Sequence, residues 1–200
     1  GRGTAVVLER AGLTVTVPER ADSEGLLSLP ALQDIAGQRL LVFRGQGGRE
    51  LLRETLQARG AEVMAVDISP ALVNIAKARL PAEHAGRVTF ASGDMTSDHG
   101  TFDYVVAMDS LIYYGTADIT QALSRLGART SGAVVFTVAP RTPFLMAFWT
   151  LGRAFPRADR SPVMVPHAHA TLTRATGGKV SKVDRVSRGF YISECLEYRP

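Results

Sequence analysis

The stretch from Leu40 to Asp67 limits the fold more than any other part of this 200-residue chain. It begins with the short apolar run Leu40–Phe43, which is typical of a parallel strand buried on both faces. Three glycines follow within five residues, and leucines then recur at roughly helical spacing until Gly60. A second apolar run ends at Asp67. This order of strand, glycine turn, helix and strand predicts half of a nucleotide-binding α/β unit.

The glycine turn and Asp67 are the first candidates for ligand contacts. Gly45 and Gly47 allow a sharp turn and let backbone N–H groups approach a ligand. Asp67 lies about 20 residues beyond the turn, where a dinucleotide-binding unit has a ribose-binding acid. Arg49 departs from this pattern, because a full fingerprint has a further small residue there.

The rest of the chain repeats the alternation of strands and helices. Apolar runs with strand character lie at residues 88–91, 102–108, 133–138, 180–186 and 189–196. Helical patterns lie at residues 69–80, 117–126, 143–153 and 168–175. The alternation predicts one α/β domain over residues 1–200, with a doubly wound, mostly parallel sheet and a C-terminal antiparallel hairpin. We expect Leu40–Phe43 to lie centrally, between Val63–Val66 and Phe102–Met108.

Composition excludes several classes of protein. No apolar stretch approaches the roughly 20 residues of a membrane span, and no signal peptide opens the chain. The single cysteine, Cys195, excludes an internal disulfide and fits a reducing cytoplasm, and its strand context predicts a small core residue. The sequence therefore predicts a cytoplasmic protein without a transmembrane segment.

The positive charge is concentrated in the last third of the chain. Residues 141–200 hold ten Lys and Arg against four acids, whereas residues 62–140 hold five against eight. This concentration of positive charge suits the binding of an anionic small molecule or a membrane surface. Nucleic acid is disfavoured, because the arginines are dispersed and no aromatic platform interleaves with them.

A histidine pair offers the one sequence pattern that resembles a metal site. His167 and His169 form an H-x-H pair, but no third ligand is evident in the sequence. The favoured interpretation is an exposed, Pro-rich loop, and no metal is predicted.

Five segments after about Glu62 resemble a known family. They are AVDISPALVNIA (65–76), RVTFASGDM (87–95), FDYVVAMDSLIYY (102–114), SGAVVFTVAPRTP (131–143) and RVSRGFYIS (185–193). The first three are shared by class I S-adenosylmethionine-dependent methyltransferases. The last two are specific to the magnesium-protoporphyrin IX O-methyltransferase family. The resemblance implies methyl transfer to a propionate carboxylate of an anionic porphyrin.

The first 61 residues resemble a different family. GRGTAVVLERAGLTV, ADSEGLLSLPALQ and GQRLLVFRGQGGRELLRETLQARGA look like part of the second domain of uroporphyrinogen-III synthase. That family has a flavodoxin-like sheet and uses no nucleotide, which implies that the glycine turn is structural. Two families that meet near residues 60–65, inside one α/β unit, indicate an engineered chimera. Synthase activity is not expected, because only part of one domain is present.

The methyltransferase resemblance assigns roles around a bound S-adenosylmethionine. Gly45 and Gly47 would lie under its methionine part. Asp67 would accept hydrogen bonds from the ribose hydroxyls, and Ile68 would pack on the adenine.

Four further residues complete this assignment. Asp94 would accept from the adenine amino group beside Met95, and Asp109 and Ser110 would flank the sulfonium. For Asp67 and Asp94 the alternative is helix capping at a strand–helix junction.

The resemblance also names residues on the substrate side. Arg141 would hold a propionate in a bidentate pair, or would cap a helix as a surface arginine. Tyr113 stands where many family members have histidine, and would either hydrogen-bond substrate or pack. No strong base is required, since a carboxylate is already ionised at neutral pH. The aromatic residues Phe144, Phe148 and Trp149 are expected to form the packed face of a helix rather than a porphyrin contact.

Three functional hypotheses follow. The chain is an active porphyrin carboxyl methyltransferase, a binder of S-adenosylmethionine or S-adenosylhomocysteine without turnover, or a designed scaffold without function. The third is favoured, because the family's own N-terminal helices are replaced and Arg49 brings a cation toward the sulfonium. Leu13–Val17 is expected at a sheet edge, in a partner chain or in irregular structure. No oligomeric state is predicted.

Overall fold

The computed structural model describes residues 27, 32–44, 55–56, 59–80, 82, 85–154, 163–188 and 191–200. The predictions for Leu13–Val17, for Gly45 and Gly47, and for Arg49 lie outside the described residues. Within the described part, no helix is both long and apolar enough to span a membrane.

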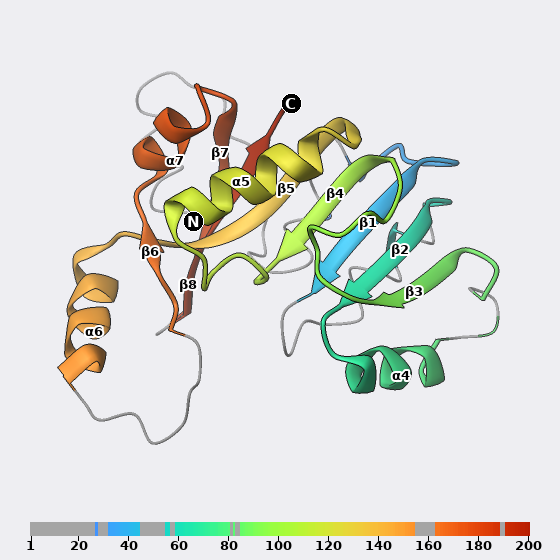
Figure 1. The fold of residues 1–200 in the computed structure, drawn as a ribbon, viewed down its shortest axis with the longest axis horizontal. Helices are drawn as coiled ribbons and strands as arrows, with labels where there is room; N and C mark the ends of the chain where they lie inside the picture. Colours follow the sequence, from blue (N-terminus) through green and yellow to red (C-terminus); the bar gives the residue numbers. More distant parts are fainter. Residues whose placement is uncertain are drawn as a thin grey trace.

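One mixed sheet forms the centre of the fold, in the order β3-β2-β1-β4-β5-β8-β7, with β6 paired to the end of β5 (Figure 1). The strands are β1 Arg39–Arg44, β2 Glu62–Asp67, β3 Val88–Ser92, β4 Phe102–Met108, β5 Thr130–Pro140, β6 Pro166–His167, β7 Val180–Arg188 and β8 Tyr191–Tyr198. The pairs among β1 to β5 are parallel, and β8 runs antiparallel to both β5 and β7. The predicted class I methyltransferase sheet, with β1 between β2 and β4 and a C-terminal antiparallel hairpin, is confirmed.

Both faces of the sheet are buried, as the continuous apolar runs predict. In β1, Leu41 and Phe43 belong to one buried cluster, whereas Leu40 and Val42 belong to the other. This division reflects the alternation of side chains along a strand. The first cluster lies beneath α5 (Thr116–Gly127), which crosses over β4 and β5 in Figure 1.

Helix positions follow local signals closely. α4 (Pro70–Ala78) begins with Ser69 as N-cap and proline at its first position, and the Ser69 hydroxyl accepts from the Leu72 N–H at 3.4 Å. α5 buries Ile119, Ala122, Leu123 and Leu126, which are spaced at helical intervals. α7 (His169–Ala175) matches the predicted short helix.

In α6 (Pro143–Ala154), the described side chains depart from the prediction at Phe144. Leu145 is its buried anchor, with 4% of its surface exposed, whereas Phe144 is 42% exposed. The expectation that Phe144 belongs to the packed face is therefore wrong.

Candidate functional site

The carboxyl ends of the parallel strands meet at one edge of the sheet. Asp67, the last residue of β2, pairs with Ser92 of β3, and its carbonyl accepts from the Gly93 N–H at 3.1 Å. On the other side of β1, Arg44 pairs with Met108, so that Asp109 lies just beyond this edge. Strand order reverses between β1 and β4, and open α/β sheets bind ligands in the crevice at such a switch point.

Asp67 holds a tight turn after β2 and keeps one carboxylate oxygen available. Its Oδ1 accepts from the Ser69 N–H at 2.8 Å. Within the described residues, the second oxygen has no hydrogen-bond partner. Ser69, not Asp67, caps α4. The adjacent Ile68 is 78% exposed, so an apolar side chain stands beside a free carboxylate oxygen.

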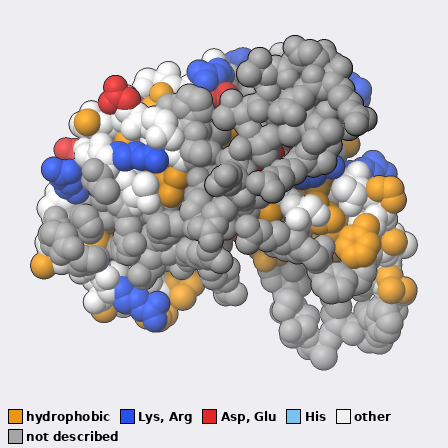
Figure 2. Space-filling model, turned by 180° about the vertical axis from the view of Figure 1, so that it is seen from behind, with side chains coloured by type: hydrophobic (Ala, Val, Ile, Leu, Met, Phe, Trp, Pro, Cys, Tyr) orange, Lys and Arg blue, Asp and Glu red, His pale blue; other side chains and the backbone are white. Residues whose placement is uncertain are grey.

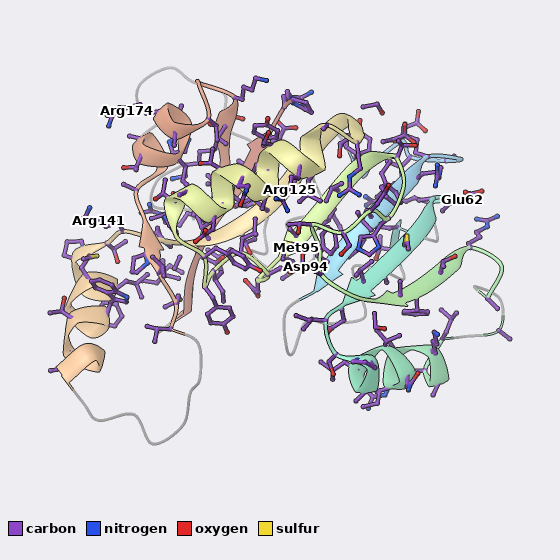
Figure 3. All side chains as sticks on the ribbon, in the orientation of Figure 1. Glu62, Asp94, Met95, Arg125, Arg141 and Arg174 are labelled. Atoms are coloured by element: carbon purple, nitrogen blue, oxygen red, sulfur yellow. The ribbon has the colours of Figure 1, made fainter. Side chains whose placement is uncertain are left out.

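Asp94 is also held by a local turn. Its Oδ1 accepts from the Thr96 N–H at 2.6 Å and from the Thr96 hydroxyl at 2.5 Å. These two bonds, first that of the hydroxyl, lower the pKa of Asp94 below its usual range and keep the side chain ionised. Met95 packs against the buried cluster under α5, and Figure 3 shows Asp94 and Met95 next to one another.

Asp109 has the most constrained backbone at this edge. Its φ of +53° places it in the left-handed region, which costs an L-residue roughly 1 kcal/mol or more. Its N–H donates to the Thr137 hydroxyl oxygen at 2.8 Å, and that hydroxyl donates to Asp109 Oδ1 at 3.0 Å. Thr137 lies on β5 and is buried. The next residue, Ser110, turns back to its own strand by donating to the Met108 carbonyl at 3.1 Å.

Thr137 was missed by the sequence reasoning. The available signal is that it is the only hydroxyl residue in the apolar run Ala133–Ala139. A hydroxyl in a buried strand needs a partner, because an unpaired polar group in the core is costly.

The two tyrosines after β4 differ in how far they are buried. Tyr113, the predicted substrate contact, is 46% exposed. Tyr114 packs against the core, and burial, followed by the negative charges of Asp94 and Asp118, raises its pKa. The negative charge of the Asp94 carboxylate therefore acts on the hydroxyl of Tyr114.

His167 is buried rather than exposed, which contradicts the loop interpretation. It lies on β6, its Nε2 is 2.9 Å from the Tyr114 carbonyl, and its Nδ1 is 3.4 Å from the Thr116 hydroxyl. Burial lowers the pKa of His167, and its bond to the Tyr114 carbonyl opposes this. Among the described residues, no group of three or more His, Cys, Asp or Glu is arranged to hold a metal ion.

Arg141 lies apart from the acids. It follows β5, its side chain is exposed, and its N–H donates to the His167 carbonyl at 2.7 Å. In Figure 3 it stands at the start of α6, separated across the view from Asp94 and Met95. The structure thus brings Asp67, Ile68, Asp94, Met95, Asp109 and Ser110 to one edge and places Arg141 beyond it.

Large apolar side chains are exposed on and near α6, the helix that begins two residues after Arg141. Phe144 and Leu151 of α6 and the nearby Met164 are 42%, 59% and 37% exposed. Hydrophobic side chains are visible on this side of the molecule in Figure 2. Cys195, by contrast, lies on β8 and packs against the second buried cluster, in line with the predicted core position, and burial raises the pKa of its thiol to about 12.

Comparison with known proteins divides the chain between two families. A family profile described as uroporphyrinogen-III synthase HemD matches residues 1–97, and one described as magnesium-protoporphyrin IX methyltransferase C-terminus matches residues 107–200. Uroporphyrinogen-III synthase of Salmonella typhimurium is 58% identical over 65 residues, which are 32% of this chain and 26% of the synthase. The chain thus spans about a quarter of that enzyme.

The methyltransferase relationship extends over most of the chain. Magnesium-protoporphyrin O-methyltransferase of Rhodobacter capsulatus is 56% identical over 187 residues, covering 92% of this chain and 83% of that protein. A crystal structure of magnesium protoporphyrin IX methyltransferase from Synechocystis PCC 6803 with bound SAH superposes with a TM-score of 0.66 at 26% identity, covering 82% of this chain and 75% of that one. The chain therefore belongs to the magnesium-protoporphyrin O-methyltransferase family, as a two-part composite whose first part matches uroporphyrinogen-III synthase.

Proposed function

We propose that the carboxyl edge of the sheet binds S-adenosylmethionine and S-adenosylhomocysteine, and that the inherited reaction is methyl transfer to a carboxylate of magnesium protoporphyrin IX. The observation that carries this proposal is the placement of three carboxylates, on Asp67, Asp94 and Asp109, at successive strand ends around the switch point. The two similar magnesium-protoporphyrin methyltransferases described above, one of them with bound SAH, support this proposal.

The groups at this edge suit such a ligand chemically. Asp67 has an oxygen left over to accept from ribose hydroxyls, and the exposed Ile68 beside it suits an adenine face. Asp94 uses one oxygen for Thr96 and has the other for an adenine amino group. Negative charge at the strand ends, including that of Asp109, also favours a cationic sulfonium. Met95 and Ser110 complete the proposed contacts.

On the substrate side, positioning is the main task of the protein. S-adenosylmethionine supplies a methyl group activated by its sulfonium. An ionised propionate can accept that group without a general base. Arg141 would pair with a propionate, while the apolar surface of α6 and Tyr113 would contact the macrocycle. An exposed cation beside an apolar surface fits a flat apolar molecule that carries carboxylates.

A second candidate is ligand binding without turnover. Its basis is the synthase-like first part, in which Arg49 stands where a small residue is wanted. We propose on this basis that residues 1–61 and 62–200 are two fragments joined by design into one α/β domain, and that turnover is low or absent.

Two measurements separate these candidates. Calorimetric titration with S-adenosylhomocysteine should release or absorb heat with a single site, and no heat at millimolar ligand would exclude binding. Incubation with magnesium protoporphyrin and methyl-labelled S-adenosylmethionine then tests turnover. Labelled ester would establish an active enzyme, whereas binding without ester would leave the non-catalytic binder.

A further inference from the structure

Asp109 combines a chemically useful position with an unfavourable backbone conformation. It follows β4 directly, at the edge where the proposed ligand binds, and it is the only non-glycine residue with positive φ in the described part of the chain. Aspartate tolerates the left-handed region better than most residues, but it does not adopt it by default. Contacts with neighbouring residues must therefore stabilise this conformation of Asp109.

Thr137 provides that selection through a reciprocal pair of hydrogen bonds. Its hydroxyl oxygen accepts from the Asp109 N–H at 2.8 Å, and its proton goes to Asp109 Oδ1 at 3.0 Å. One hydroxyl thus fixes both the backbone and the carboxylate of the same residue. The contact spans two neighbouring strands, in which Ala107 of β4 pairs with Phe136 of β5.

Burial of Thr137 favours these two hydrogen bonds over bonds to water. Thr137 is 9% exposed, so its hydroxyl has little access to solvent as an alternative partner. If Asp109 left the left-handed region, both the Thr137 hydroxyl and the Asp109 N–H would lose their bonds at the same time. Unpaired buried donors and acceptors are disfavoured, so the two residues hold each other in place.

We infer that Thr137 is a positioning residue for ligand binding, which locks Asp109 in the left-handed conformation and thereby sets the place of the Asp109 carboxylate at the ligand edge. The effect on ligand binding rests on the proposed function. The conformational lock does not, because it is argued from the hydrogen bonds between Thr137 and Asp109 and from no ligand.

The decisive variant is Thr137→Val, which keeps the shape of the side chain and removes both bonds. We expect the affinity for S-adenosylhomocysteine to fall about tenfold, as for the loss of one to two net hydrogen bonds. In NMR spectra, we expect the strong intraresidue HN–Hα NOE that marks positive φ at Asp109 to weaken. Thr137→Ser retains the hydroxyl and should restore both signals.

Thr130→Val is the matched control. Thr130 lies on the same strand, is 7% exposed, and donates its hydroxyl to the Leu126 carbonyl at 2.7 Å, at the opposite end of β5. This variant also removes a buried hydroxyl bond, but away from Asp109, so it should leave affinity and the Asp109 NOE unchanged.

Each outcome decides a separate point. If Thr137→Val binds as well as Thr130→Val and keeps the NOE, the inference is overturned. If the NOE weakens but affinity does not change, the lock exists and its role in binding is refuted. If the unaltered chain does not bind S-adenosylhomocysteine, the proposed function fails, and the NOE alone decides whether Thr137 positions Asp109.

Discussion

The acids on the two sides of β1 are held in place by different means. On the β2–β3 side, Asp67 and Asp94 each bond to a residue two positions later in the chain, Ser69 and Thr96. On the β4 side, Asp109 bonds to Thr137, 28 residues away on the neighbouring strand. The first two carboxylates therefore depend on local turns, and the third depends on the register of the sheet.

This difference bears on how the site depends on the two parts of the composite chain. A local turn forms wherever its few residues are present, because its hydrogen bonds close within the turn itself. The Asp109–Thr137 pair forms only when β4 and β5 are aligned as they are here. Both of those strands lie within the methyltransferase-like part, so we expect the longer-range half of the site to be preserved in the composite.

The largest expected effect concerns Asp67. Asp67→Ala removes the proposed ribose contact as well as the turn, and we expect the affinity for S-adenosylhomocysteine to fall at least about a hundredfold, because hydrogen bonds to a charged acceptor are strong. Asp67→Asn is the informative companion, since its amide oxygen can still accept from the Ser69 N–H. Calorimetric titration of both variants with S-adenosylhomocysteine distinguishes the role of Asp67 in the turn from its role in ligand contact. Wild-type affinity in Asp67→Asn would show that Asp67 serves only the turn.

Local elements of the fold could be predicted from the sequence because their causes are local. The strand Phe102–Met108 was predicted with its observed limits, and Ser69-Pro70 marked the start of α4. Continuous apolar runs implied a sheet covered on both faces, and the two buried clusters agree with this. The candidate acids were found for the same reason, since each lies at or just beyond the end of an apolar strand.

Contacts between distant segments could not be predicted in this way. His167 was assigned to an exposed loop from its Pro-rich surroundings, but its burial arises from contact with Tyr114, 53 residues earlier. Thr137 and Tyr114 likewise gain their places from strands and loops that only the folded sheet brings together. Phe144 illustrates the same limit, because helical periodicity alone does not fix which face meets the core.

The next effect in size is a coupling energy. In a double-mutant cycle on S-adenosylhomocysteine affinity, Thr137→Val and Asp109→Asn should couple by about 1 kcal/mol, as expected for residues in direct contact. The parallel cycle of Thr137→Val with Asp67→Asn should be additive within about 0.5 kcal/mol, because in the described part of the chain no hydrogen bond joins those two residues. Equal coupling in both cycles would mean that the two sides of the site are not independent.

A smaller expected effect tests whether the acid after β3, Asp94, is held by contacts within its own turn alone. Arg129, in the turn just before β5, donates to the Ser97 carbonyl at 2.6 Å and to Asp98 Oδ1 at 3.2 Å, so it holds the loop that follows Asp94. We expect Arg129→Ala to weaken binding of S-adenosylhomocysteine about threefold, since an exposed ion pair contributes little on its own. Arg174→Ala, on α7, is the control for loss of a surface arginine. If Arg129→Ala weakened binding as much as Thr137→Val, long-range contacts would matter equally on the β2–β3 side and on the β4 side. The proposed difference between the two sides would then be wrong.

The smallest expected effect is a pH dependence that arises on the β4–β5 side. Burial lowers the pKa of His167 below its usual 6.5, so the unfolded chain takes up a proton there before the folded chain does. Its contribution to stability is therefore complete above pH 6.5 and is lost as the pH falls below that value toward the lower folded pKa. Melting temperatures measured at pH 7.5 and 5.5 should show a decline that His167→Gln reduces by about 2 °C, because glutamine stays neutral. Identical declines in both proteins would show that protonation of His167 does not oppose the contact between β6 and the loop after β4.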